Sequence, residues 1–352
     1  MLKKAPVYRV FIVLLLLVLI ISIVAVSCMG AMKVPLEDTF AILINKLFGI
    51  PLPGDDHIAI AVQNVIWELR FPRILLGIAV GAGLSLSGVI MQASVQNTLA
   101  EPYILGISSG ATFGATFAIM LGAGTLGLGS AAATPLFSFL GSLVATLGVL
   151  LLASSGGKMT APRLVLAGMI LNALFTAFSN FIITIAANAE GMLDLKFWTM
   201  GSLTRASWDD VWIVIGVVAA GALFFMTQFR SLNLMMMGDE AAITLGINTV
   251  RRRWIYLSVS ALMVGSMVAA SGTIGFVGLM IPHITRSFVG SDNRRLIPAA
   301  LLVGAIFLLW ADALARTLIP NSEVPIGIIT AVVGAPFFVY IMVARNYSFK
   351  GN

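Results

Sequence analysis

Residues 106–110 carry the one pattern in this chain that is typical of a nucleophilic enzyme. Gly106-Ile-Ser-Ser-Gly110 fits G-x-S-x-G, the turn on which many hydrolases hold their serine. Ser108 or Ser109, with His283 as base, would make an intramembrane serine protease. That motif requires a turn between a strand and a helix, whereas here it opens an apolar run. The protease therefore remains an alternative, and we predict no catalytic residue.

Few other residues could catalyse a reaction or bind a metal, a nucleotide or an ion. The chain has two histidines and one cysteine, and His283 has no carboxylate or thiol at ligand spacing, so no metal site is predicted. Gly156-Gly-Lys158 lacks the remaining positions of a phosphate loop, so we expect neither ATP hydrolysis nor a cofactor in this chain. Asp312 is the only clear carboxylate within a predicted span. An ion-coupled secondary transporter, which needs paired carboxylates at the midplane, is the second alternative.

Composition identifies the environment in which these residues lie. Of the 352 residues, 59% are hydrophobic and 10% charged, against about 25% charged in soluble domains. The chain is therefore an all-α polytopic membrane protein. Its net charge of +6 is assigned to cytoplasmic loops rather than to nucleic-acid binding. Gly77-x-x-x-Gly81 and Gly110-x-x-x-Gly114 favour close helix packing inside the chain over dimerisation.

About ten segments approach the roughly 20 apolar residues that a span requires. They form one transmembrane domain over residues 1–352. The predicted spans are Val7–Met29, Ile74–Ala93, Ile104–Leu121, Ala132–Ala153, Leu164–Ala187, Val211–Phe229, Trp254–Ala270, Ile274–Ile284, Ile297–Ile319 and Ile326–Val343. Ile274–Ile284 is too short to cross alone, and such a helix is tolerated only where protein or a cavity covers its backbone.

Ten spans leave both termini on one side, and placing that side in the cytoplasm puts about two thirds of the Lys and Arg residues there. The first span is interpreted as an uncleaved helix rather than a signal peptide. Arg70, Arg73 and Arg316 fall at the outer ends of spans. Asp312 and Arg316 stand at i and i+4 and can pair. The three arginines either snorkel to the lipid headgroups or form a basic docking surface for an acidic partner.

Residues 230–253 form a polar island between apolar spans. Asp239 can cap a short helix, and Glu240 suits its positive end. Gly246 can end this helix in the left-handed conformation. Asn248 or Thr249 can cap a second short helix, with Arg251 to Arg253 on its C-terminal side. The island is either an ordinary capped loop or a rigid docking surface.

The island also resembles a known family. Residues 238–246 are similar to the E-A-A-x-x-x-G loop of ABC importer permeases. Further matches follow in order, and together they resemble the permeases for iron-siderophores, haem and vitamin B12, from about Arg70 to Val343. The motifs are Arg70-Phe-Pro-Arg73, Asn97-Thr-Leu-Ala-Glu-Pro102, Leu105-Gly-Ile-Ser-Ser-Gly-Ala111, Gly275-Phe-Val-Gly-Leu-Met-Ile-Pro-His-Ile-Thr-Arg286, Ala311-Asp-Ala-Leu-Ala-Arg316, Glu323-Val-Pro-Ile-Gly327 and Gly334-Ala-Pro-Phe-Phe338.

This resemblance implies a permease subunit of type II ABC importer architecture in a bacterial or archaeal plasma membrane. It implies a homodimer, or a pair of related permeases, with two cytoplasmic ATPases that carry the ATP and Mg. It implies one periplasmic or lipid-anchored binding protein, which docks at Arg70, Arg73 and Arg316. The ATPases would bind a coupling helix made by Gly238, Asp239, Glu240, Ala241, Ala242, Leu245 and Gly246.

The resemblance also implies two cytoplasmic gate segments, at Asn97 to Leu99 and at Thr160-Ala161. The family's Asn-Pro-Leu-Ala reads Asn-Thr-Leu-Ala here, so Thr98 leaves the backbone freer than proline would. Leu99 either gates or packs at a helix end. Pro282, His283 and Arg286 are expected to shape the inner end of the short helix and to face the ATPase region. Family frequency favours a ferric siderophore as substrate, followed by haem, cobalamin and oxyanions.

Overall fold

The computed structural model describes residues 5–30, 34–50, 60–122, 130–155, 159–320 and 322–344. Gly156 to Lys158 therefore lie outside the described residues. The helices that follow the predicted spans are α1 (Ala5–Cys28), α4 (Phe71–Val95), α5 (Ile107–Met120), α6 (Ser130–Ser154), α7 (Ala161–Ala186), α9 (Trp208–Thr227), α12 (Thr249–Ser271), α13 (Val277–Val289), α14 (Asn293–Thr317) and α15 (Ile326–Ala344). A helix thus lies over each predicted span, and eight of the described helices are long and apolar enough to cross a membrane.

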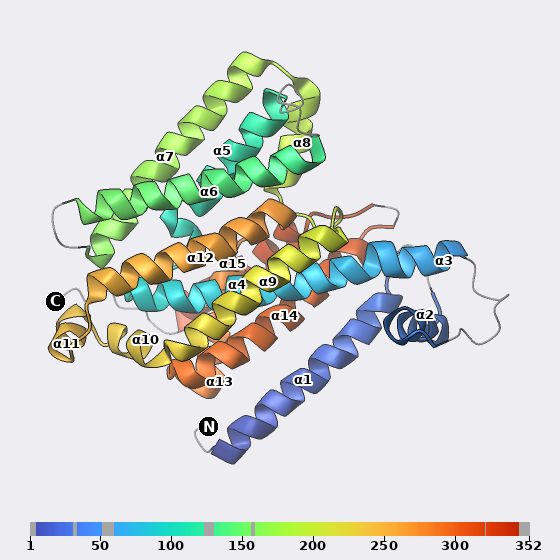
Figure 1. Ribbon diagram of the computed structural model, residues 1–352, viewed down its shortest axis with the longest axis horizontal. Coiled ribbons are helices and arrows are strands. Elements are labelled where there is room, and N and C mark those ends of the chain that lie inside the picture. The colour runs from blue at the N-terminus through green and yellow to red at the C-terminus, as the bar shows by residue number, and fades with distance from the viewer. Residues whose placement is uncertain are drawn as a thin grey trace.

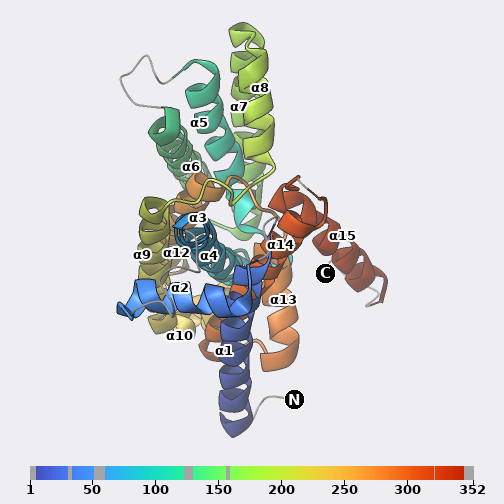
Figure 2. The same ribbon diagram turned by 90° about the vertical axis from the view of Figure 1, so that its right-hand side faces the viewer.

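Most of the other helices lie at the two ends of the bundle, whereas the turn at Pro102–Leu105 packs beside the start of α13. The following elements were not predicted from the sequence: α2 (Leu36–Phe48), α3 (Ile60–Asn64), the π-helical turn η1 (Val65–Arg70), the 3-10 turn η2 (Pro102–Leu105) and α8 (Ala189–Thr199). Two short helices, α10 (Phe229–Met235) and α11 (Asp239–Thr244), fall in the polar island. Figure 1 shows α10 and α11 at the end where α1 begins, with α2 and α3 at the opposite end. Figure 2, turned by 90°, shows α2 lying across the far end of α1.

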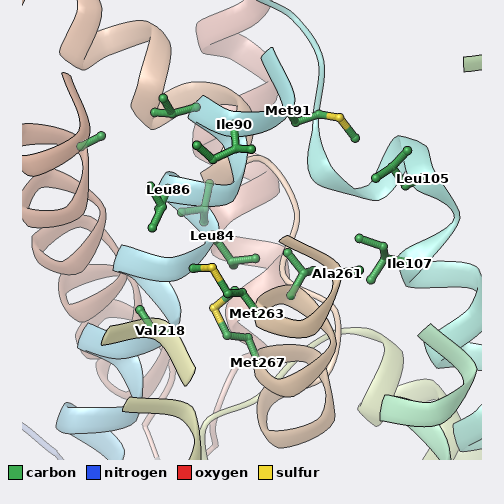
Figure 3. Close-up of a cluster of buried hydrophobic side chains, with 14 of the residues drawn as sticks. Leu84, Leu86, Ile90, Met91, Leu105, Ile107, Val218, Ala261, Met263 and Met267 are labelled. Atoms are coloured by element: carbon green, nitrogen blue, oxygen red, sulfur yellow. The ribbon is translucent and has the colours of Figure 1, made fainter. Parts of the chain in front are cut away.

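Helix α4 is the centre of the bundle. Its apolar window is 83% buried, against 17% for those of α1 and α7, which lie at the edges. In the core, Met263 and Met267 of α12 lie beside Leu84 of α4 and Val218 of α9 (Figure 3). Flexible thioether side chains fill irregular gaps of this kind.

Glycines let the central helices cross in contact. A Cβ added to Gly81 in α4 would lie 2.3 Å from the carbonyl oxygen of Gly304 in α14. A Cβ at Gly110 in α5 would lie equally close to the carbonyl oxygen of Gly141 in α6. The interpretation of these small-residue motifs as internal packing is therefore confirmed.

A Gly81→Val variant is expected to lose about 1–3 kcal/mol of stability, because the added methyl groups force the α4–α14 crossing apart. Gly216→Val is the matched control, since a Cβ at Gly216 in α9 meets nothing within 4 Å. Thermal unfolding in detergent measures both variants. Equal melting temperatures for the two would contradict the close crossing.

Helix α13 begins three residues later than predicted and ends five later, but its 13 residues still span only about 20 Å. Its N-terminus is held inside the protein by the loop after α4. The Glu101 carboxylate accepts a hydrogen bond from the backbone N–H of Phe276 at 2.8 Å. Phe276 has φ +69, a strained value for a residue with a Cβ. The Tyr103 hydroxyl bonds the backbone of Ile274. Protein groups thus satisfy the backbone where this helix starts.

Candidate functional site

The polar island folds into α10, α11 and the first turn of α12. The side chain of Asn248 accepts a hydrogen bond from the N–H of Arg251 at 2.9 Å, so its prediction as a cap is confirmed. The helix it caps is the 23-residue α12. The prediction of a second short helix ending in Arg251 to Arg253 is wrong. These arginines lie in the first two turns of a membrane helix, because the apolar run that follows continues the helix without a break.

Asp239 does not cap α11, and that prediction is wrong. Gly238, with φ +110, takes the capping position without a side-chain bond. The Asp239 carboxylate instead accepts hydrogen bonds from Arg253 at 2.7 and 2.9 Å and from the Gln96 amide at 2.6 Å. A guanidinium in α12 therefore competes successfully for the carboxylate. At the other end, Gly246 has φ +83, and the N–H of Ile247 reaches the carbonyl of Ala242, so the left-handed end is confirmed.

Helix α11 presents large apolar side chains at its surface. Met237, Ile243 and Leu245 are 67%, 58% and 59% exposed, while Ala242 is fully buried. Glu240 is exposed on the same short helix. Large exposed apolar side chains gathered on one short polar segment are typical of an interface with another protein. Sequence reasoning named Leu245 and missed Met237 and Ile243, although apolar residues inside a polar island were a usable signal.

The two predicted gate segments lie near α11. The Asn97 side chain accepts a hydrogen bond from the N–H of Leu99 at 2.9 Å, an Asx turn that shapes the segment in the presence of Thr98. Leu99 is half-buried, and Ala100 is fully buried. Thr160 precedes Ala161, the first residue of α7. Whether these segments gate a pathway stays a prediction.

Arg253 connects α11 to both gate segments, whereas the sequence placed it only on a short helix and among the cytoplasmic positive charges. Its side chain is fully buried. Its guanidinium donates to the carbonyl of Ser94 at 2.8 Å and to that of Met159 at 2.6 Å, in addition to Asp239. One side chain thus links α11 to the chain just before each predicted gate segment.

A polar stripe runs along the exposed face of α7. Asn172, Thr176, Asn180 and Thr184 follow one another at intervals of four residues, and they lie on its accessible side. The first three also line a cavity of about 460 Å³, to which α5 contributes hydroxyl groups and α8 contributes Lys196. Sequence reasoning missed this stripe, although polar residues at a spacing of four inside an apolar span were its signal.

The arginines predicted as an outer basic surface are buried instead. Arg70, Arg73 and Arg316 are only 6%, 8% and 8% exposed. Arg73 pairs with Asp312 and Glu323, each at 2.9 Å, and Asp312 also pairs with Arg316 at 3.1 Å, as its spacing predicted. Arg70 donates to the carbonyl of Ser27. The carboxylates and carbonyls of neighbouring helices therefore hold the guanidiniums inside this subunit, and whether a binding protein docks over them stays a prediction.

Glu323 gives this cluster a pH dependence. Partial burial opposes its ionisation, but Arg73 and the Thr204 hydroxyl hold the pKa of Glu323 below its ordinary value of 4.5. Its stabilisation is complete above the pKa of an unfolded-chain glutamate and is lost as the pH falls through the lower folded pKa. The melting temperature of the wild type should therefore exceed that of Glu323→Gln at pH 7, and the gap should close below about pH 4. A gap that is constant with pH would contradict this role.

The Pro282–Arg286 motif lies within α13 and packs inside the chain. The ring of His283 contacts Phe337 and Phe338 of α15 edge-on, and Arg286 donates to Gln92 at 2.8 Å. The motif's expected orientation toward the ATPase region stays a prediction. Ser109 donates to the carbonyl of Gly106, so its hydroxyl bonds the backbone, which gives the protease no support. No group of three His, Cys, Asp or Glu side chains in the described ranges can hold a metal ion.

Comparison with known proteins identifies similar chains. The model of the FecCD transport family matches residues 14–344. A haemin transport permease of Yersinia pestis is 36% identical over 83% of this chain and 86% of its own length. A cobalamin import permease of Halobacterium salinarum is 37% identical over 88% of this chain and 79% of its own length.

A solved structure shares the architecture. It is an inward-facing conformation of an ABC transporter, which its description assigns provisionally to the metal-chelate type. The two chains superpose with a TM-score of 0.79 at 33% identity, over 96% of this chain and 99% of the other.

Proposed function

Because the chain belongs to the FecCD transport family and is an ABC importer permease of the plasma membrane, we propose that it forms half of an ATP-driven pathway for a metal chelate. The other half is a second permease, a copy of this chain or a related one. Two cytoplasmic ATPases supply the work, and a periplasmic or lipid-anchored binding protein delivers the substrate. Both termini lie in the cytoplasm.

One observation carries this proposal, the polar stripe on the exposed face of α7. Lipid tails cannot accept or donate hydrogen bonds, so amide and hydroxyl groups at membrane depth require water, substrate or protein beside them. A pathway between two permeases supplies all three. Asn172, Thr176 and Asn180 then form one wall of the pathway. Their neutral groups suit a large substrate that passes without being held tightly.

The coupling step is assigned to α11. ATP binding closes the ATPases, and the exposed apolar side chains of α11 transmit that movement to the permease as alternating access. Glu240 and the N-terminal end of α11 add a polar rim to this contact.

The substrate class rests on the relatives and on family frequency. Haem and cobalamin, named for two relatives, are both large metal chelates. A ferric siderophore is the first candidate for this chain, followed by haem and cobalamin. The binding protein does the selecting, so the compound that it retains on purification would identify the substrate.

We place the docking position of the binding protein at the outer ends of α4 and α14. The three arginines there exceed the two carboxylates by one positive charge. Because these arginines are buried, reversing their charge would disturb the fold as well as docking. Salt dependence of docking by the intact complex is the cleaner measurement, and tighter docking at low salt is expected.

ATP-driven uptake into proteoliposomes tests the function directly. We expect uptake of the chelate retained by the binding protein to require internal ATP and to survive dissipation of ion gradients. Uptake that follows an ion gradient without ATP would favour the secondary transporter.

The stripe has its own test. Replacing Thr176 and Asn180 together by leucine should lower uptake by about tenfold or more, because two hydrogen-bonding groups worth about 1 kcal/mol each are lost. Met169→Leu, an exposed apolar position of α7, is the control. Both chains should melt at similar temperatures, and unchanged uptake by the double variant would remove the stripe from the pathway.

A further inference from the structure

Four segments that are distant in the chain meet at one buried guanidinium. Arg253, the fifth residue of α12, bonds Asp239 in α11, the Ser94 carbonyl at the end of α4 and the Met159 carbonyl before α7. Gln96 strengthens the same junction, since its amide donates to Asp239. We call Arg253, Asp239 and Gln96 the clasp.

We propose that Arg253 is a positioning residue that makes α11 and the two gate segments move as one body. This inference rests on the proposed coupling role of α11. The proposal supplies the contact through which a displacement of α11 is transmitted to residues 97–100 and 160–161.

The geometry of the clasp favours a rigid link. The two terminal nitrogens of Arg253 meet the two oxygens of Asp239 at 2.9 and 2.7 Å, a forked pairing that fixes orientation as well as distance. The same guanidinium is fully buried, while the Asp239 side chain is 30% exposed. Separation of the pair would leave a buried positive charge without its carboxylate, which is costly. Displacing α11 therefore carries Arg253 with it, or else breaks this pair.

The carbonyl partners determine where the movement goes. Ser94 lies three residues before Asn97, and Met159 directly precedes Thr160. A carbonyl held at 2.6 or 2.8 Å by a charged donor follows that donor over small shifts. Both gate segments thus receive the same displacement, and a change of side chain at Asp239 should release both of them together.

Spin-label distances within the chain test this link. In a Cys28→Ser background, labels at Thr244 and Ser155 report the separation of α11 from the loop before α7, because both residues are exposed. Labels at Thr244 and Asp209 report movement of α11 relative to the outer end of α9. The protein is measured as the complex with its copurified ATPase, with and without ATP and Mg.

In the wild type, ATP should change the 244–209 distance and leave the 244–155 distance constant. In Asp239→Asn, that constancy should be lost, and Asp239→Glu should restore it. Arg251→Gln is the matched control, since Arg251 is the exposed neighbour two positions away. A merely structural clasp would lower the melting temperature of Asp239→Asn without making the 244–155 distance depend on nucleotide.

The outcomes separate the two claims. A constant 244–155 distance in Asp239→Asn, with α11 still moving, would overturn the clasp and leave the proposed function intact. A wild-type complex in which neither distance responds to ATP would overturn the proposed function together with the clasp.

Discussion

Replacing Asp312 with alanine is expected to destabilise the protein by about 3–5 kcal/mol, the largest loss we predict for a single side chain. Asp312 is 1% exposed and lies between the guanidiniums of Arg73 and Arg316. Without it, two buried positive charges would face each other at the outer ends of α4 and α14. Glu323 could compensate only one of them, because it already pairs with Arg73.

Yield of folded chain and thermal unfolding in detergent measure this effect. Asp209→Ala is the control, since Asp209 is an exposed carboxylate in the first turn of α9, also at the outer end. Asp312→Asn should fall between the two, because the amide oxygen can still accept a hydrogen bond. Melting temperatures for Asp312→Ala and Asp209→Ala within a degree or two of each other would show that the cluster does not hold these helices together.

Replacing Ile243 with aspartate is expected to release the ATPase subunits from the solubilised complex. Ile243 is 58% exposed on α11 near Leu245, and a hot-spot contact buried at the centre of an interface is worth about 2 kcal/mol or more. That corresponds to a loss of affinity of about thirtyfold or greater. Uptake should fall with it, while the permease itself stays folded, because the exposed side chain contributes little to the core.

Copurification of the ATPase with the tagged permease measures this loss. Phe48→Asp is the matched control, since Phe48 is 74% exposed at the opposite end of the bundle. Retention of the ATPase by Ile243→Asp in normal amounts would mean that α11 is not its docking helix. Release by Phe48→Asp would instead indicate that the wrong end of the bundle has been assigned to the cytoplasm.

Hydropathy and local pattern by themselves determined much of this protein. The helices over the ten predicted spans followed from runs of apolar residues, because a membrane helix satisfies its backbone within itself and needs no distant partner. The short α13, the left-handed Gly246, the Asn248 cap and the Asp312–Arg316 pair were also predictable. Each of these depends on residues within about one turn of one another.

Tertiary structure alone decided where the charged side chains went. Asp239 could cap its own helix, but Arg253, 14 residues later, binds it instead. The sequence predicted Arg73 on the outer surface, but Asp312 and Glu323, which are 239 and 250 residues away in the chain, hold its side chain in the interior. A charge is drawn to whatever opposite charge the packed helices bring near it. The neighbouring residues along the chain and their spacing do not specify which opposite charge will become its partner.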